Sequence, residues 1–286
     1  MVFARNDGCT LRVVQGFREQ VLSHRPSVTP KPNWSDEDYS AAAHKKLQRW
    51  RRLLTEVSRW RGTLDGAEVL DVGCGDGINC LLVGLQSVRR AVGIDLELPL
   101  FESGERGERT RRLASTILEK LALGGDLDDV LSRRPVRFAT MDVTLMTFPD
   151  DSFDLLISRS AMEHITPVEK ALTEMARVVR PGGLIHHSID PYFWLRGCHK
   201  TGLVDIPWAH ARLSLEEFRR FVTESEGESI AAKRCQRLET LNRFTLRQWL
   251  TRIEAGPFGD LGVERGALFF RRDAAGESSR RGGYLA

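Results

Sequence analysis

The sequence predicts an α/β protein built on a mostly parallel, doubly wound sheet, and three observations lead to this fold class. Short runs of Val, Leu and Ile recur between residues 64 and 190, separated by stretches with helical spacing. The first run, 68–72, passes directly into a turn with three glycines at alternate positions. A Pro-Gly-Gly turn at 181–183 then converts a helix end into a further strand.

The glycine-rich turn is the most informative feature of the chain. Residues 71–77 read D-x-G-x-G-x-G, and the chain becomes apolar again from Ile78. Glycines remove the side chains that keep a ligand away from the backbone, so this turn is typical of a site for a nucleotide-like cofactor. A tight turn without a ligand is the alternative. Ile78 stands where the G-x-G-x-x-G/A pattern needs a small residue, which argues against an NAD-dependent oxidoreductase. Such an oxidoreductase is kept as an alternative function.

Further apolar runs predict the remaining strands. Four of them lie at 91–96, 136–143, 153–158 and 184–190. Asp95 comes 24 positions after Asp71, about where a βαβ unit needs an acidic residue to accept both ribose hydroxyl protons. The runs 261–264 and 267–270 fit the last two strands only if a very short turn joins them, and a strand at 229–235 is the alternative.

Segments 64–190, taken in order, resemble the type 11 group of class I S-adenosylmethionine (SAM) dependent methyltransferases. The resemblance rests on the glycine turn, on D-S-F-D-L-L at 151–156, on A-M-E-H-I at 161–165 and on V-R-P-G-G at 179–183. It implies a Rossmann-like class I methyltransferase fold, with a mostly parallel seven-stranded sheet, helices on both faces, an N-terminal helical lid and an insertion after strand five. SAM would be the cofactor and S-adenosyl-L-homocysteine the product.

The resemblance also implies which residues hold SAM. Asp71 would approach the sulfonium, Asp95 would hold the ribose hydroxyls, and Asp142 with the Val143 backbone nitrogen would bind the adenine. Residues 158–160 would lie beside the methionine carboxylate or amine of SAM. Each carboxylate has an alternative role as the cap of a helix or turn. The implied set is Asp71, Gly73, Cys74, Gly75, Gly77, Asp95, Leu96, Asp142, Val143, Ser158, Arg159 and Ser160.

A proton acceptor is needed if the methyl acceptor is a hydroxyl, and histidine is the usual residue for that role. The candidates are His164, after strand four, and His187 or Asp190, at the carboxyl end of strand five, where such sheets bind ligands. Alternation along the strand puts His186 and His187 on opposite faces. The alternative for each histidine is a structural role. No metal site is expected, because the five cysteines include no C-x-x-C pair.

Helix signals organise the rest of the chain. Ser35 is expected to cap a long helix, and three prolines are expected to keep residues 1–33 irregular. Capping boxes at Thr166, Ser214 and Thr245 predict three further helices. The expected segments are an N-terminal arm and helical lid (1–63), the SAM-binding core (64–190), a substrate-side insertion with helices and terminal strands (191–272) and a flexible tail (273–286).

Composition excludes several functional classes. The chain has 286 residues, 41% of them hydrophobic, and a formal net charge of +3, which is far from the basic balance of a nucleic-acid-binding domain. We therefore expect nucleic acid to be an unlikely partner. No apolar run is long enough for a membrane span, and the N-terminus does not resemble a signal peptide, so a cytoplasmic protein is expected.

The sequence therefore predicts an enzyme that methylates a small molecule at oxygen. The segments 205–212 and 242–244 resemble bacterial relatives of the surface-glycan or secondary-metabolite type. The sequence carries neither an N-P-P-Y/F motif nor a Pro-Cys nucleophile of the cytosine-5 type. An RNA or protein methyltransferase and a non-catalytic SAM-binding scaffold are the alternatives. The identity of the acceptor and the oligomeric state are left open by the sequence.

Overall fold

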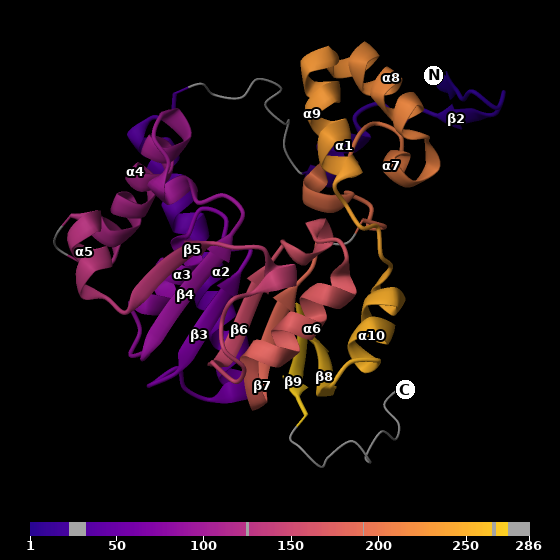
Figure 1. The fold of residues 1–286 in the computed structure, drawn as a ribbon. Coiled ribbons are helices and arrows are strands. Elements are labelled where there is room, and N and C mark those ends of the chain that lie inside the picture. Colours follow the sequence, from indigo (N-terminus) through magenta and orange to yellow (C-terminus); the bar gives the residue numbers. More distant parts are fainter. Residues whose placement is uncertain (23–32, 124–125, 191, 265–266, 274–286) are drawn as a thin grey trace. The chain divides into compact units, whose positions relative to one another are not determined.

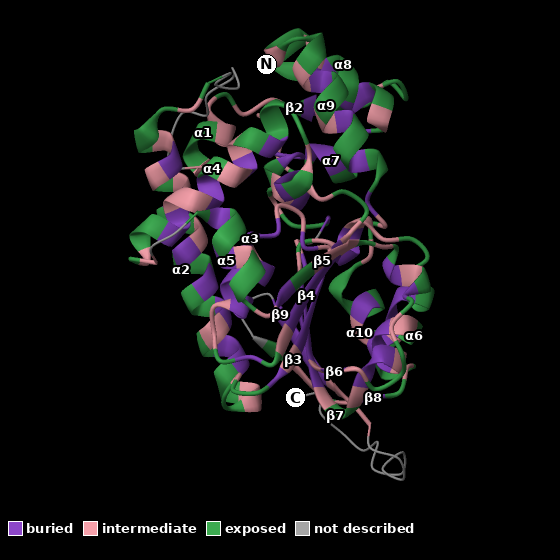
Figure 2. Cartoon of the chain, turned by 60° about the vertical axis from the view of Figure 1, so that its left-hand side comes forward, coloured by how far each residue is buried: buried purple, intermediate pink, exposed green. Residues whose placement is uncertain are grey.

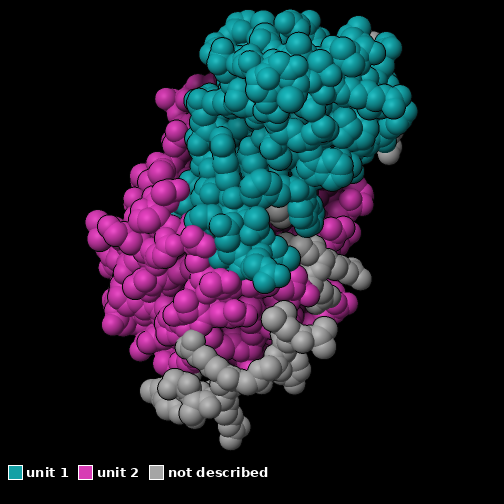
Figure 3. All heavy atoms as spheres, turned by 90° about the vertical axis from the view of Figure 1, so that its right-hand side faces the viewer, with its two compact units in different colours: residues 1–32, 163–165, 190–249 teal, residues 33–162, 166–189, 250–286 magenta. Residues whose placement is uncertain are grey.

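The computed structural model describes the chain in two compact units (Figure 3). The described residues are all of 1–286 except 23–32, 124–125, 191, 265–266 and 274–286. Unit 1 comprises residues 1–32, 163–165 and 190–249, and unit 2 comprises 33–162, 166–189 and 250–286. The predicted flexible tail lies outside the described residues from residue 274 onward.

Unit 2 contains a seven-stranded sheet with helices on both faces, which confirms the predicted fold class (Figure 1). The strand order is β5-β4-β3-β6-β7-β9-β8, and only β9 runs antiparallel to its neighbours. Parallel strands covered on both faces are near-continuous apolar runs, which is why the sequence reveals them. The strands are β3 (Glu68–Val72), β4 (Arg90–Asp95), β5 (Val136–Thr140), β6 (Phe153–Arg159), β7 (Val179–Ser188), β8 (Phe258–Glu264) and β9 (Ala267–Arg272).

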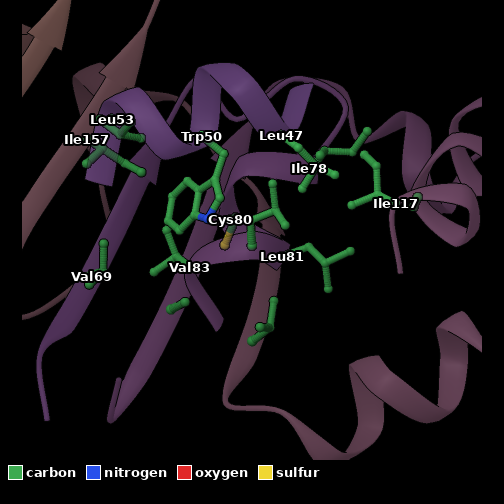
Figure 4. Packing of buried hydrophobic residues seen from close by; sticks show 14 of the residues in the cluster. Leu47, Trp50, Leu53, Val69, Ile78, Cys80, Leu81, Val83, Ile117 and Ile157 are labelled. Atoms are coloured by element: carbon green, nitrogen blue, oxygen red, sulfur yellow. The ribbon is translucent and has the colours of Figure 1, made fainter. Parts of the chain in front are cut away.

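Helices of unit 2 pack on this sheet through buried apolar stripes, while their outer faces are exposed (Figure 2). They are α2 (Asp36–Arg61), α3 (Ile78–Gly84), α4 (Glu105–Lys120), α5 (Leu127–Arg133) and α6 (Val168–Val178), with short 3-10 turns η1 (Pro99–Phe101) and η2 (Val143–Leu145). Helices α2 to α5 share one hydrophobic cluster with the sheet, and the Trp50 ring of α2 lies beside Cys80 and Val83 of α3 (Figure 4).

Helix α2 begins as predicted. Ser35 caps it in a full capping box, in which the Ser35 hydroxyl accepts from the Asp38 backbone N–H and the Asp38 carboxylate accepts from the Ser35 N–H. The predicted apolar stripe is buried at Ala43, Leu47 and Trp50. Helix α2 is therefore part of the core of unit 2, and its predicted role as a lid stays a prediction.

The end of the sheet resolves the alternatives that the sequence left open. Strands β8 and β9 pair antiparallel, with Glu264 opposite Ala267, so only two residues of the sequence separate the paired strands. The alternative strand at 229–235 is wrong, because these residues lie in helix α9 (Glu228–Glu239). Ala231, Cys235 and Leu238 are buried at three- and four-residue spacing, and this helical period outweighs the local strand-like composition.

Unit 1 gathers mostly short elements around its own hydrophobic cluster. They are β1 (Val2–Ala4), β2 (Thr10–Arg12), α1 (Phe17–Leu22), η4 (Cys198–Lys200), α7 (Ala209–Arg212), α8 (Leu215–Glu226) and α9; η3 (Met162–His164) and α10 (Leu246–Glu254) cross the boundaries between the units. The prediction of an irregular arm was wrong for residues 1–22, because Phe3 and Leu11 pair across a hairpin and are buried against the cluster. The three prolines of the arm lie outside the described residues.

The predicted capping boxes have different outcomes. Those at Ser214 and Thr245 form, with Glu217 and Gln248 as their partners. The box at Thr166 was wrong: Pro167 is itself the N-cap of α6 and no side chain caps this helix. Among the described residues, no helix is both long and apolar enough to cross a bilayer.

Candidate active site

The glycine loop of unit 2 follows the carboxyl end of β3. Gly73, Gly75 and Gly77 all have φ between 55° and 72°, the left-handed region that glycine adopts without strain. The loop is fixed to the next strand by the Cys74 N–H, which donates to the Ile94 carbonyl at 3.0 Å. Gly77 is the N-cap of α3 and provides no side-chain cap, and the Ile78 N–H at this helix start donates to the Asp76 Oδ1 atom at 3.3 Å.

Two of the glycines are needed for close packing and one faces open space. A Cβ atom at Gly73 would lie 2.3 Å from the Ala161 Cβ, and one at Gly77 would lie 2.9 Å from the Phe138 ring. A Cβ atom at Gly75 would meet no atom within 4 Å. The middle glycine therefore presents its backbone to a space that a ligand can occupy.

Replacing Gly73 by alanine is expected to destabilise unit 2 by about 2–4 kcal/mol, because strain at a positive φ adds to a clash with the half-buried methyl group of Ala161. Gly66→Ala is the matched control: Gly66 has φ of 66° but no neighbour within 4 Å, so only the conformational cost of about 1 kcal/mol remains. Urea unfolding of both variants measures the difference. Equal losses would show that the contact with Ala161 is unimportant.

Asp95 ends β4 and ties the glycine loop to this strand. Its Oδ2 accepts from the Gly75 N–H at 2.7 Å, and its Oδ1 accepts from the Leu96 N–H at 2.8 Å. The sequence placed Asp95 at the cofactor, and the structure places it against the middle glycine of the loop. Its carboxylate also orders the loop, as the capping alternative anticipated.

Asp71 and Ser158 are buried polar residues on adjacent strands β3 and β6. They are 2% and 0% exposed, and the Asp71 Oδ2 and Ser158 Oγ atoms have no hydrogen-bond partner among the described residues. Burial raises the pKa of Asp71 from 3.8 to about 7, against the opposing charge of Arg159. Buried polar atoms without partners are costly and mark places where a further group binds.

Arg159 ends β6, and Ser160 follows it at the same edge of the sheet. The Arg159 guanidinium donates to the Asn79 amide oxygen at 3.1 Å, and burial lowers its pKa. Ser160 has φ of 50°, and its N–H donates to the Ser188 carbonyl of β7. Lys46 of α2 forms an ion pair with Asp76 of the glycine loop, so opposite charges surround the loop. Lys46 and Asn79 were not among the predicted site residues, because only the fold brings them to this loop.

A cavity of about 740 Å³ lies beside the ends of β4 and β5, and Leu96, Phe101, Phe138 and Thr140 are among its lining residues. Leu96 is 68% exposed, which is unusual for a large apolar side chain. Asp142 caps the η2 turn through the Thr144 N–H at 2.8 Å, and Val143 is buried in that turn. The capping alternative for Asp142 is thus realised.

His186 and His187 lie on β7, and both are buried. His186 lies with its Nε2 3.3 Å from a Glu56 carboxylate oxygen of α2, and its ring packs edge-on against Phe269. Burial lowers the pKa of His187 to about 3, so its imidazole is neutral at physiological pH. A base of this pKa is poorly matched to proton transfer near neutrality.

The other two base candidates, His164 and Asp190, lie in unit 1, where His199 joins them. The His164 Nε2 atom is 3.2 Å from the His199 Nε2 atom, and the His199 Nδ1 atom is 3.3 Å from the Asp190 carboxylate. Glu163 and Cys198 complete this cluster. The sequence analysis missed Cys198 and His199, and the only local signal for them is the dipeptide Cys-His in the aromatic-rich segment after strand five.

Comparison with known proteins gives the class to which the core of this chain belongs. Residues 70–186 match the family described as a methyltransferase domain. This range contains the glycine loop, Asp95, Asp142 and the Pro-Gly-Gly turn. Residues 70–186 are therefore similar to a methyltransferase domain, and the resemblance drawn from the motifs is confirmed over this range.

Curated relatives of known name are similar over part of their length. The demethylmenaquinone methyltransferase of Renibacterium salmoninarum is 27% identical over 184 residues, which cover 61% of this chain and 62% of the relative. The ubiquinone biosynthesis O-methyltransferase of Rhizobium rhizogenes is 28% identical over 123 residues, or 43% of this chain and 41% of the relative. This chain thus spans less than two thirds of the length of either relative.

Among solved structures, phosphoethanolamine N-methyltransferase 2 of Haemonchus contortus in complex with SAM aligns with 75% of this chain and 38% of its own. The TM-score is 0.46 and the sequence identity is 20%. Similarity at this level does not bear on the substrate.

Proposed function

We propose that this chain transfers the methyl group of SAM to an oxygen atom of a small molecule. The observation that carries the proposal is the pair of buried atoms Asp71 Oδ2 and Ser158 Oγ, at the strand ends beside the glycine loop, which have no hydrogen-bond partner within the described part of the chain. Ligands of parallel α/β sheets bind at these carboxyl ends. An open Gly75 backbone next to an anionic carboxylate suits a cationic cofactor with a polar tail.

Each part of SAM would contact a different group of residues around the glycine loop. Asp71 would face the sulfonium, and residues 158–160 would hold the methionine end. Asp95 would accept from the ribose hydroxyls while keeping its bond to Gly75. Leu96, Asp142 and Val143 would lie around the adenine. The cavity lined by Leu96 and Phe138 supports this placement.

The chemistry supplied by bound SAM is displacement of its methyl group, and the protein's contribution is alignment. Holding two reactants in line can supply roughly 7–11 kcal/mol of barrier reduction. Since burial lowers the pKa of His187 to about 3, its imidazole is a weak base, and the proposal does not depend on a strong one. An acidic hydroxyl such as a phenol or enol reaches its reactive anion most easily. One relative is named an O-methyltransferase and another a C-methyltransferase, so the experiment below, and not the relatives' names, decides the acceptor atom.

Features of unit 1 support a small apolar or aromatic acceptor. Phe193, Trp194 and Trp208 lie in the segment after strand five and are 45%, 56% and 46% exposed. Large exposed aromatic side chains favour flat or apolar ligands. A nucleic-acid acceptor is less well supported, because the net charge is only +3.

Transfer of labelled methyl from SAM tests this proposal. The full chain is incubated with labelled SAM and, in separate reactions, with phenolic and quinol small molecules, total RNA and a protein extract. The expected result is label in ether-extractable products, where it is held in O-methyl bonds that alkali does not cleave. Label in RNA or protein alone would replace the acceptor class, and SAM binding without any transfer would favour the scaffold alternative.

Replacing His187 by alanine is expected to lower the free energy of unfolding by about 2–4 kcal/mol, because a buried ring is removed. Turnover per folded molecule is expected to stay within about threefold of wild type, since this imidazole is neutral at assay pH. Urea unfolding and kcat at saturating SAM measure the two effects. A kcat reduced by about 100-fold or more with unchanged stability would establish His187 as the base after all.

A further inference from the structure

Four residues of unit 1 bring potential metal ligands together. The ligand atoms of Glu163, His164, Cys198 and His199 all lie within 4.8 Å of one another. The pairs are separated by 35 positions in the sequence, and the backbone holds them in place: the Asn242 N–H donates to the Glu163 carbonyl, and the His199 N–H donates to the Asp190 carboxylate. We propose that these four residues bind one Zn²⁺ ion.

Hydrogen bonds fix the tautomer of His164. The Thr240 hydroxyl has a single proton, which it donates to the Arg237 carbonyl at 3.0 Å. It must therefore accept from the Nδ1–H of His164, which lies 3.0 Å away. The lone pair of His164 is then on Nε2, the atom that faces the cluster.

The same reasoning applies to His199. Its Nδ1 atom lies 3.3 Å from an Asp190 carboxylate oxygen, and this nearby acceptor favours the tautomer that carries the proton on Nδ1. The Nε2 lone pair of His199 then faces the Nε2 lone pair of His164 at 3.2 Å. Two lone pairs at this distance repel each other unless a cation or a proton lies between them. Metal-bound histidines typically donate their other ring N–H to a carboxylate or similar group, which is the pattern seen here.

Glu163 provides the independent observation. Its side chain is 3% exposed, and its Oε2 atom has no hydrogen-bond partner among the described residues. Its Oε1 atom lies 3.7 Å from the His199 Nε2 atom and 3.9 Å from the Cys198 Sγ atom. A buried carboxylate that touches a thiol and an imidazole, yet leaves one oxygen unpaired, is costly unless a cation or a proton neutralises it.

The donor set and spacing select zinc. One sulfur, two imidazole nitrogens and one carboxylate oxygen are ligands that zinc accepts in tetrahedral sites. Two nitrogen ligands at roughly 2.0–2.1 Å from a tetrahedral ion lie about 3.3 Å apart, close to the 3.2 Å between the histidines. Four protein ligands leave no open position, so the proposed ion is structural: it fixes the segment at 163–164 to the segment at 198–199. The sequence predicted no metal site because it lacks a C-x-x-C pair. That criterion does not detect a ligand set that contains one cysteine, two histidines and one glutamate.

The test uses the full chain with any affinity tag removed. Elemental analysis after dialysis is expected to find one zinc per chain, and X-ray absorption is expected to show one sulfur at about 2.3 Å and nitrogen or oxygen at about 2.0–2.1 Å. Cys198→Ser is expected to remove the sulfur signal and most of the affinity for Zn²⁺ in a competition titration. Cys235→Ser, at another buried cysteine of unit 1, is the matched control and is expected to keep both.

A positioning variant keeps the proposal testable if Cys198→Ser does not fold. Asp190→Asn leaves all four ligands in place and is expected to weaken Zn²⁺ binding by about 10- to 100-fold. The proposal is overturned if the wild-type chain binds Zn²⁺ no more tightly than Cys198→Ser. It is also overturned if the absorption spectrum lacks a sulfur ligand, or if another metal occupies the site in preference to zinc.

Discussion

Replacing Asp71 by asparagine is expected to make the stability of the chain less sensitive to pH while weakening its affinity for SAM. The folded pKa of Asp71 is about 7, raised from 3.8 by burial. A raised carboxyl pKa gives stability that is fully present below pH 4 and is lost as the pH rises through 7. Between pH 5 and pH 8, ionisation of this one group is expected to lower the wild-type free energy of unfolding by roughly 2–3 kcal/mol. The variant lacks this decrease.

Urea unfolding at pH 5 and pH 8 measures the effect as a difference between variant and wild type, so that other titrating groups cancel. The charged groups that act on Asp71 are Arg159, Lys46, Asp76 and Asp95, and all are present in both proteins. Asp65→Asn is the matched control, because Asp65 is exposed and lies before β3. A variant whose stability changes in parallel with wild type would show that Asp71 does not titrate in this range.

The pH dependence of binding to the wild-type chain is expected to differ between SAM and its product. A sulfonium cation stabilises the Asp71 carboxylate, so binding of SAM at pH 6 must release a proton, and wild-type affinity is expected to rise by about tenfold or less from pH 6 to pH 8. S-adenosyl-L-homocysteine has no charge on sulfur and is expected to show a smaller rise. Titration calorimetry at both pH values measures this. Equal pH dependence for the two ligands would remove Asp71 from the sulfonium side.

Replacing Asp95 by alanine is expected to weaken SAM binding by about 1–3 kcal/mol, or roughly 5- to 150-fold. Two causes add: the ribose hydroxyls lose their charged acceptor, and the Gly75 N–H loses the partner that orders the glycine loop. The second cause was not apparent from the sequence. Calorimetry with SAM measures the sum.

Two control variants separate these causes. Asp65→Ala removes an exposed carboxylate before β3 and is expected to leave the affinity unchanged. Asp95→Asn keeps an acceptor for the Gly75 N–H but removes the charge, and its affinity is expected to lie between those of wild type and Asp95→Ala. Unchanged affinity in Asp95→Ala would exclude Asp95 from the cofactor site.

The sheet of unit 2 was predictable because its signals are local. Strands such as β3 and β6 are buried on both faces and are therefore apolar along their length, and the glycine loop needs its residues at fixed positions. The hairpin of β1 and β2 was missed because three-residue strands show no period, and only Phe3 and Leu11 contribute to the core.

The site residues that could be predicted from the sequence are those whose position follows from a strand end or from the glycine loop. Asp71 and Asp95 end strands, so their place at the ligand-binding edge follows from sequence order. The contact of Lys46 with Asp76 joins residues that only the fold brings together. The same holds for the cluster around His199, and for the burial that depresses the His187 pKa, because strand alternation gives a side chain's face and not its depth.

Calorimetric titration of the full chain with SAM, S-adenosyl-L-homocysteine and NAD tests the central claim most directly, since every proposed role depends on a SAM site at the glycine loop. We predict micromolar binding of SAM and S-adenosyl-L-homocysteine with one site per chain, and no binding of NAD. Binding of NAD alone would contradict the account and restore the oxidoreductase alternative, whereas binding of none of the three would show that the loop holds no such cofactor.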